Sequence, residues 1–183
     1  DRPYNDLEFY LFLRGHPRAN EWRFSRALTH LAQGLTPEAG VHLEFKIDSL
    51  DRFRRRPISM YSYDLVAGHR YLGTGPDPLA DCEAHIEAAR IPLAEATRLL
   101  FNRCTGLLLA RERLLSPVLT EEQRDFVQRN LAKVRLALGD VFLTVHGQYH
   151  WSCRERHRRL LNSTWRDAPA WLGQVQGQHG LGV

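Results

Sequence analysis

The stretch Tyr4-Asn5-Asp6-Leu7-Glu8-Phe9-Tyr10-Leu11-Phe12-Leu13 alternates between apolar and polar side chains, and this alternation predicts a β-strand. Successive side chains of a strand point to opposite faces, so one face carries Asp6, Glu8 and Tyr10. Two carboxylates this close raise each other's pKa unless a cation lies between them or the face is solvated. The doublet alone leaves two alternatives open: a divalent-cation site, or an edge strand with a solvated face.

A second stretch, Gly40-Val41-His42-Leu43-Glu44-Phe45-Lys46-Ile47-Asp48, alternates in the same way. Its polar face carries His42, Glu44, Lys46 and Asp48. If the two strands are neighbours in one sheet, Glu44 lies beside Asp6 and Glu8. Three carboxylates on one polar face are what a two-metal phosphoryl-transfer site requires, because the metals neutralise phosphate charge and lower the pKa of the attacking oxygen.

The acidic pattern Asn5-Asp6-Leu7-Glu8-Phe9, followed by Leu43-Glu44-Phe45, resembles the signature of the nucleotidyltransferases of the DNA polymerase β superfamily. The kanamycin nucleotidyltransferase-like members and the small bacterial nucleotidyltransferase-domain proteins are the most similar. A further stretch, Ser62-Tyr63-Asp64-Leu65-Val66-Ala67-Gly68-His69-Arg70-Tyr71-Leu72-Gly73, resembles the segment that closes the catalytic domain in these proteins. The likeness covers the first seventy or so residues by motif and the remainder by helical character.

This resemblance implies a transfer of a nucleoside monophosphate from a nucleoside triphosphate to an acceptor hydroxyl. Asp6 and Glu8 would bridge two Mg²⁺ ions, and Glu44 would bind the metal nearer the acceptor and assist its deprotonation. Lys46, Arg54 and Arg55 are the candidates for phosphate contacts. Glu95, farther along the chain, is a weaker candidate for the base that accepts the proton of the acceptor hydroxyl.

The sequence departs from the family pattern in one respect. The family places a Gly-Ser loop ahead of the acid pair, and the backbone amides of that loop hold the nucleotide phosphates. This sequence starts at Asp1, directly before the pair. We therefore expect that an N-terminal segment is missing from it; without the loop, nucleotide binding would be in question.

Composition indicates a globular protein. The 183 residues are 43% hydrophobic and 25% charged, with a formal net charge of +4. No apolar run is long enough to span a bilayer, and no signal peptide is visible. Cys82, Cys104 and Cys153 form no Cys-x-x-Cys pair, which favours a reduced, cytoplasmic protein. The mild positive charge suits an anionic substrate but does not by itself indicate nucleic acid.

The pattern between the two strands predicts a helix over residues 19–33 that ends at Gly34, followed by a loop over residues 35–39. Its expected buried face consists of Trp22, Ala27, Leu28 and Leu31. Ser49 is expected to cap a short helix to Phe53. The basic run at residues 52–57 is either a solvated turn or a triphosphate contact. A helix over residues 58–68 and a short strand over residues 70–73 complete this part.

The breaker cluster Gly73-Thr74-Gly75-Pro76-Asp77-Pro78 predicts a domain boundary. The predicted fold is α+β: a small mixed β-sheet domain over residues 1–75, then a helical bundle over residues 76–183 that binds substrate or dimerises. Expected helices cover residues 80–90, 92–115 and 120–146. The expected inward faces of the two long helices consist of Leu93, Ala96, Leu99, Leu100, Cys104, Leu107 and Leu108, and of Phe126, Val127, Leu131, Val134, Leu138, Val141 and Phe142.

The C-terminal part supports two interpretations. Tyr149, His150 and Trp151, followed by the basic residues 154–159, suit either nucleotide or RNA contacts, or an exposed helix with internal Glu–Arg pairs and a docked Trp151. The Arg–His spacing of HEPN ribonucleases is absent, which argues against an RNase. Two rival functions remain. One is an inactive nucleotidyltransferase-like module that binds a partner, with a homodimer through the helical pair as one form of it, and the other is a HEPN-type RNA-binding module.

Overall fold

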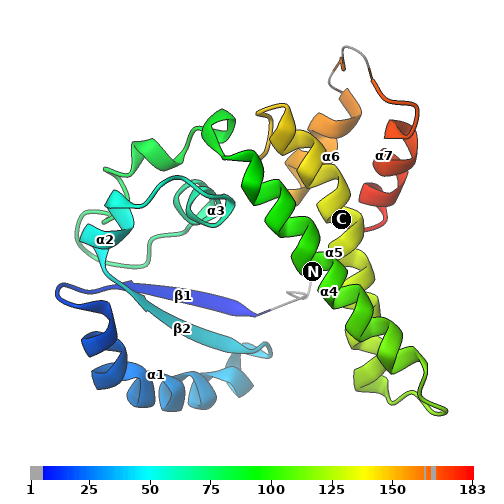
Figure 1. Cartoon of the computed structure of the whole chain (residues 1–183). Helices are drawn as coiled ribbons and strands as arrows, with labels where there is room; N and C mark the ends of the chain where they lie inside the picture. The colour runs from blue at the N-terminus through cyan, green and yellow to red at the C-terminus, as the bar shows by residue number, and fades with distance from the viewer. Residues whose placement is uncertain (1–5, 163, 166–167) are drawn as a thin grey trace. The chain divides into compact units, whose positions relative to one another are not determined.

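A computed structural model describes residues 6–162, 164–165 and 168–183 (Figure 1). They divide into two units. The first comprises the N-terminal part up to Pro57 together with Thr74–Asp81, and the second comprises Ile58–Gly73 and Cys82–Val183. The predicted boundary at residue 75 therefore falls in a short segment that returns to the first unit, and the helix over residues 58–68 belongs to the second.

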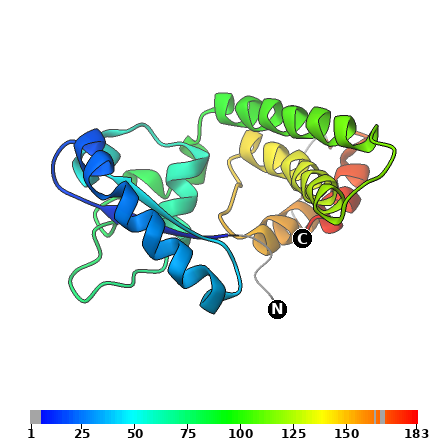
Figure 2. The same cartoon turned by 90° about the horizontal axis from the view of Figure 1, so that it is seen from below.

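The first unit is built on a β–α–β arrangement. Strand β1 (Leu7–Phe12) and strand β2 (Leu43–Asp48) pair in parallel, and the long helix α1 (Pro17–Ala39) connects them. Parallel neighbours need such a crossover because the chain must return to the same end of the sheet. Figures 1 and 2 show α1 lying along one face of the two strands. Phe9 and Phe45 stack on each other with ring centroids 5.2 Å apart.

Helix α1 is longer than the sequence pattern predicts. It continues through Gly34 and through Pro37, and ends only at Gly40, whose φ of 66° is the left-handed conformation typical of helix ends. The expected buried face is also wrong in part: Trp22 is 87% exposed and Leu31 is 47% exposed. The helix instead packs through residues spaced every four positions, namely Phe24, Leu28, Ala32 and Thr36.

The rest of the first unit is a short helix and its contacts. Helix α2 (Leu50–Arg55) follows Ser49, as predicted, although the Ser49 side chain makes no capping bond. Its Phe53 is fully buried and meets Phe12 edge to face at 5.3 Å. The Thr74–Asp81 segment contributes Leu79, which is 4% exposed. These residues give the unit its own small core.

The second unit begins with helix α3 (Met60–Gly68), which a capping box at Ser59 and Ser62 starts. The strand expected over residues 70–73 is wrong, because these residues form no strand and Leu72 is 66% exposed. The helix expected over residues 80–90 is also wrong. That stretch holds two 3-10 turns, η1 (Glu83–His85) and η2 (Ala88–Arg90), and Pro92 keeps the residue before it out of helical geometry.

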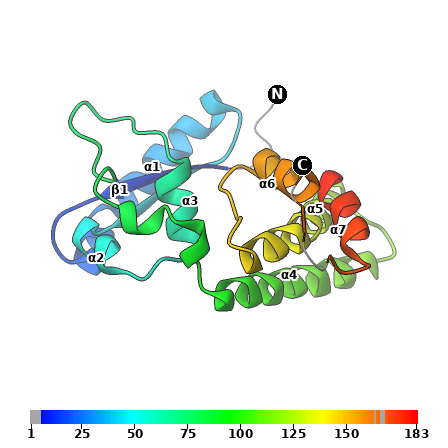
Figure 3. The ribbon, with the colours of Figure 1, turned by 90° about the horizontal axis from the view of Figure 1, so that it is seen from above.

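The two long helices of the prediction are present as α4 (Leu93–Leu114) and α5 (Glu121–Val145). Thr120 and Gln123 form the predicted capping box at the start of α5. Figures 1, 2 and 3 all show the two helices side by side. Helices α6 (Cys153–Asn162) and α7 (Leu172–Gly180) pack on α5, where Phe142, Leu143, Leu160 and Leu172 form a buried cluster.

The inward face of the long helices differs from the predicted one. Among the expected inward residues, Ala96, Val127 and Phe142 are buried, but Leu93, Leu108 and Leu131 are 60%, 65% and 40% exposed. Small residues explain the difference, because a Cβ on Gly106 would collide with the Asn130 side chain of α5. Close approach at such positions turns the large side chains of α4 outward.

The fold is therefore mixed α/β and mainly helical, with a small sheet that is parallel and two-stranded in the described residues, where a mixed sheet was expected. None of the helices in the described part of the chain is long and apolar enough to cross a membrane.

Candidate functional site

The predicted acidic face lies on the two paired strands. The register places Glu8 opposite Glu44 and Tyr10 opposite Lys46. The Lys46 ammonium is 2.6 Å from Glu8 Oε1 and 3.5 Å from Glu44 Oε2, so both carboxylates and the lysine share one face. The Tyr10 hydroxyl donates to Glu8 Oε2 at 2.8 Å. The structure thus brings together two of the three predicted acids and one of the three predicted basic residues.

The charges on this face stabilise one another. Partial burial opposes ionisation of Glu8, but the hydrogen bonds from Lys46 and Tyr10 outweigh it and lower the pKa of Glu8. Burial likewise opposes the charge of Lys46, and the two glutamates outweigh it and raise the pKa of Lys46. Both groups therefore remain charged over a wider pH range than they would alone.

Magnesium prefers carboxylate oxygens, so Glu8 and Glu44 fit this ion in donor chemistry. In the described residues, however, no three His, Cys, Asp or Glu side chains are grouped so that they could hold a metal. Asp6 is exposed and lies directly ahead of β1. The ammonium of Lys46 provides a positive charge next to the glutamate pair.

The basic run after β2 has structural contacts. Arg54 donates to Asp81 Oδ2 and to the Pro78 carbonyl, both at 3.1 Å. Arg55 is exposed on α2. Arg56 binds both oxygens of the buried Asp48 carboxylate, at 2.7 and 3.0 Å. Within the described residues, Arg52 and Arg55 are the two arginines of this run that are exposed and make no such hydrogen bond or ion pair.

Glu95, the weaker base candidate, lies at the start of α4 in the second unit. Its Oε2 accepts the backbone N–H of Met60 at 3.1 Å and pairs with Arg98 at 2.7 Å. A carboxylate at the first turn of α3 interacts favourably with the helix dipole. The contacts of Glu95 are therefore those of a helix cap.

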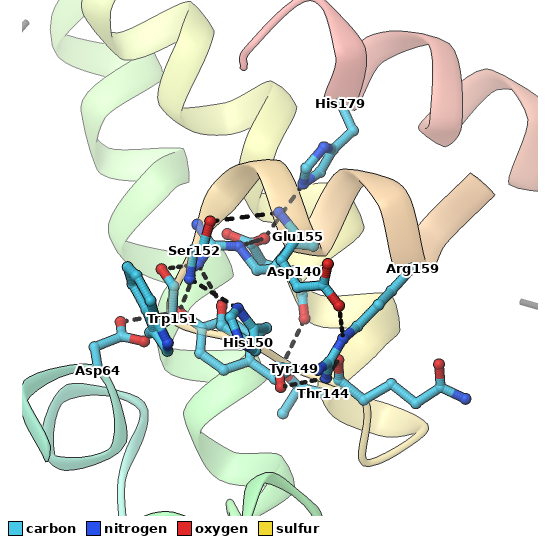
Figure 4. Close-up of polar contacts among 12 residues, drawn as sticks. Asp64, Asp140, Thr144, Tyr149, His150, Trp151, Ser152, Glu155, Arg159 and His179 are labelled. Atoms are coloured by element: carbon cyan, nitrogen blue, oxygen red, sulfur yellow. Dashed lines mark hydrogen bonds and ion pairs between the residues drawn. The ribbon is translucent and has the colours of Figure 1, made fainter. Parts of the chain in front are cut away.

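Sequence reasoning missed a second polar group, which we call the α5–α6 polar cluster: Asp64, Asp140, Tyr149, Arg156 and His179 (Figure 4). Arg156 Nε is 2.6 Å from Asp140 Oδ1, and both residues are nearly buried. Arg156 also donates to the carbonyls of His150 and Trp151, at 2.7 and 2.9 Å. The Tyr149 hydroxyl donates to Asp64 Oδ2 at 3.0 Å.

Burial dominates the ionisation of this cluster. It raises the pKa of Asp64 to about 7, although the Tyr149 hydrogen bond and the Arg156 charge act in the opposite direction. Burial also raises the pKa of Tyr149. The cluster thus combines an aspartate that titrates near neutrality with a permanently charged arginine. It joins helix α3 to the loop before α6 through Asp64 and Tyr149, and helix α6 to α5 through Arg156 and Asp140.

This cluster changes the interpretation of the basic segment. Tyr149 is 4% exposed, so it offers no open ring for a base to stack on. Glu155 pairs with Arg158 and Arg159 at 2.6 and 2.8 Å, as the alternative interpretation expected. The signal available in the sequence was a lone carboxylate in each of two apolar helical stretches, Asp64 and Asp140.

Comparisons of the chain with protein-family models, with curated proteins and with solved structures find no match.

Proposed function

We propose that the protein is a metal-dependent nucleotidyltransferase that moves a nucleoside monophosphate from a nucleoside triphosphate to an acceptor hydroxyl. The observation that carries the proposal is the strand register, which sets Glu8 opposite Glu44 on one face of a parallel β–α–β unit. That pairing is what the acidic pattern requires, since acids from separate strands must meet before they can share a divalent ion.

In this proposal Glu8 and Glu44, with Asp6 ahead of β1, provide the oxygen ligands. Bound Mg²⁺ would neutralise phosphate charge and lower the pKa of the attacking hydroxyl. Tyr10 orients Glu8 through its hydroxyl, and Lys46 keeps Glu8 ionised while its ammonium also lies 3.5 Å from Glu44 Oε2. Lys46 and the exposed Arg55 are the candidates for phosphate contacts, while Arg54 would first have to leave Asp81.

One observation favours a second candidate, a nucleotidyltransferase-like module that binds a partner without catalysis. Lys46 already supplies the charge that a metal would supply between the glutamates. In an inactive relative, such a lysine would replace the ion as the structural partner of the acid pair. An RNA-binding function of the HEPN type has less support, because Tyr149 is buried and Arg156 is engaged with Asp140.

Calorimetry and nucleotide transfer separate the two candidates. The enzyme proposal expects the protein to bind Mg²⁺ with a nucleoside triphosphate, and Glu8→Gln and Glu44→Gln to abolish that binding. A matched control is Glu21→Gln, because Glu21 is exposed on α1 away from the strands. Lys46→Gln distinguishes further: it raises the affinity for Mg²⁺ alone if the lysine competes with the ion. Absence of metal and nucleotide binding in both the native protein and Lys46→Gln would support the inactive module.

A further inference from the structure

A groove with apolar walls lies between helices α4, α5 and α7 of the second unit. Its volume of about 740 Å³ is within the range of small-molecule sites. Among the described residues that line it there is no Asp, Glu, Lys or Arg, and its walls include Leu100, Leu138, Val141, Val145, Trp171 and Val175. Val145 and Trp171 are 55% and 51% exposed, so the protein itself leaves these walls uncovered. Such a groove suits the apolar part of a ligand.

Helices α5 and α7 run antiparallel along this groove, so its two ends differ in chemistry (Figures 1 and 3). At one end, Arg135 Nε of α5 donates to Gln178 Oε1 of α7 at 3.2 Å. At the other end, the ring of Phe142 of α5 meets that of Trp171, directly before α7, edge to face at 5.8 Å. These two contacts are seven residues apart on each helix, which corresponds to about 10 Å of groove.

The end at Trp171 is aromatic. Phe142 also contacts the rings of His146 and Trp165, with centroids 4.3 and 4.8 Å away. His146 Nδ1 is 2.8 Å from the Phe142 carbonyl, and since a carbonyl oxygen only accepts, Nδ1 is the donor of this bond. The imidazole is thereby held in place against Phe142. This end of the groove offers ring surfaces and suits the apolar terminus of a ligand.

The end at Gln178 carries a cation without a counter-ion. Arg135 is half-buried, and within the described part of the chain its guanidinium bonds to Gln178 and has no carboxylate partner. Its other guanidinium N–H groups are therefore available as donors. Phe142 lies seven residues after Arg135, so both project from the same side of α5. The carbonyls at the end of α7 accept the N–H groups of Leu181 and Gly182, which reduces their repulsion of an anion.

We propose that this groove binds a medium-chain fatty acid, with its carboxylate on Arg135 and Gln178 and its chain directed along α5 and α7 toward Trp171. A guanidinium matches a carboxylate in charge and in bidentate geometry, and the Gln178 amide adds a further donor. The chain covers the exposed apolar walls between the two ends. All of these residues belong to the second unit, whereas Glu8 and Glu44 belong to the first, so the site does not depend on the proposed nucleotidyltransferase activity.

Calorimetry of the full chain with decanoate tests the carboxylate contact, and 1-decanol is the matched ligand without the charge. The native protein is expected to bind decanoate at least about tenfold more tightly than 1-decanol, because hydrogen bonds between charged groups are the stronger ones. Arg135→Gln should lower the affinity for decanoate about tenfold and leave that for 1-decanol unchanged. Lys133→Gln is the control and should change neither, because Lys133 is exposed on α5 and projects about 160° away from Arg135.

Filling the groove tests where the chain lies. Val145→Trp, and Leu138→Trp as a second variant of the same kind, should each lower the affinity for both ligands at least about tenfold, because the new ring occupies the space of the chain. Leu109→Trp is the matched control, since Leu109 is exposed on α4 and does not line the groove. Far-UV circular dichroism establishes that each variant folds.

Four results would overturn the proposal. They are the absence of decanoate binding by the native protein, equal affinities for decanoate and 1-decanol, an affinity for decanoate that Arg135→Gln leaves unchanged, and binding that persists in both groove-filling variants. Sedimentation with phosphatidylglycerol vesicles separates a free acid from a lipid surface. We expect the protein to stay in the supernatant; sedimentation with the vesicles without binding of decanoate would assign the groove to a membrane surface instead.

Discussion

At the scale of single residues, Asp64 is a carboxylate whose ionisation is strongly opposed by burial. Burial raises its pKa from 3.8 to about 7, although the Tyr149 hydroxyl and the more distant Arg156 charge support its carboxylate. Its Oδ1 is buried and has no hydrogen-bond partner among the residues that the structure describes. Because the pKa of Asp64 is higher in the folded state than in the unfolded state, the folded state binds more protons than the unfolded state at pH values between the two pKa values. Stability contributed by the protonated form is therefore present at low pH and is lost as the pH rises toward 7.

This gives a prediction for Asp64→Asn. The variant cannot ionise, so its free energy of unfolding relative to the native protein should increase by about 2 kcal/mol between about pH 4 and about pH 8. This change is roughly half of the free energy that the full pKa shift of Asp64 corresponds to, because the partly exposed carboxylate keeps some of its hydration. Urea unfolding at several pH values measures the difference. Parallel pH profiles for the two proteins would show that Asp64 is not perturbed.

Tyr149→Phe provides a companion variant. It removes the hydroxyl that donates to Asp64, so the pKa of Asp64 should rise further and the loss of stability should shift to higher pH. A carbon-detected NMR titration of the Asp64 carboxyl group reports the pKa directly. An unchanged titration in Tyr149→Phe would contradict the role assigned to that hydrogen bond.

At the scale of helices, glycines show where elements approach closely and where they do not. A Cβ on Gly139 of α5 would collide with the buried ring of His179 and come within 2.9 Å of Leu160. Both of these side chains are fully buried and have no room to move. A Cβ on Gly34 of α1 or on Gly173 of α7 would meet no atom of the described residues within 4 Å.

We therefore expect opposite effects from the same substitution. Gly139→Ala should destabilise the protein by about 1–3 kcal/mol through overpacking. Gly34→Ala and Gly173→Ala should stabilise it by about 0.5–1 kcal/mol, since alanine is the better helix former. Thermal unfolding of the three variants measures this. A destabilised Gly34→Ala would mean that α1 ends there, as the sequence pattern alone suggested.

The same elements show what the sequence could predict. Alternation located both strands because a two-residue period is specific to an extended chain, and it placed Glu8 and Glu44 on one polar face. Capping residues located the start of α5. The end of α1 could not be found, because Gly34 and Pro37 are ordinary helix breakers that packing against β2 overrides. The packed face of α4 was missed because small residues, not leucines, set the approach of α5.

The α5–α6 polar cluster lay beyond sequence reasoning for a different reason. Arg156 lies in the basic stretch of residues 154–159, and nothing in the local sequence distinguishes it from Arg154 or Arg158, which are exposed. Its burial follows from Asp140, sixteen positions earlier on another helix. Pairings of this kind depend on tertiary packing, which a one-dimensional pattern does not contain.

At the scale of the whole molecule, the chain crosses between its two units three times, and each unit has its own core. Chains with separate cores do not usually unfold in a single two-state transition. Of the four tryptophans, Trp151, Trp165 and Trp171 lie in the second unit, while Trp22 is 87% exposed on α1 of the first. Tryptophan fluorescence should therefore report mainly on the second unit, and far-UV circular dichroism on both.

Substitutions in the two cores should then separate the two signals. Phe53→Ala removes a fully buried ring from the first unit and should cost that unit about 3–5 kcal/mol. We expect an early loss of circular dichroism with an unchanged midpoint of tryptophan fluorescence. Leu143→Ala, equally buried in the second unit, should cost about 2–5 kcal/mol and shift the fluorescence midpoint instead. If Phe53→Ala moves both signals together, the two units unfold as one, and the separate cores do not act as independent sources of stability.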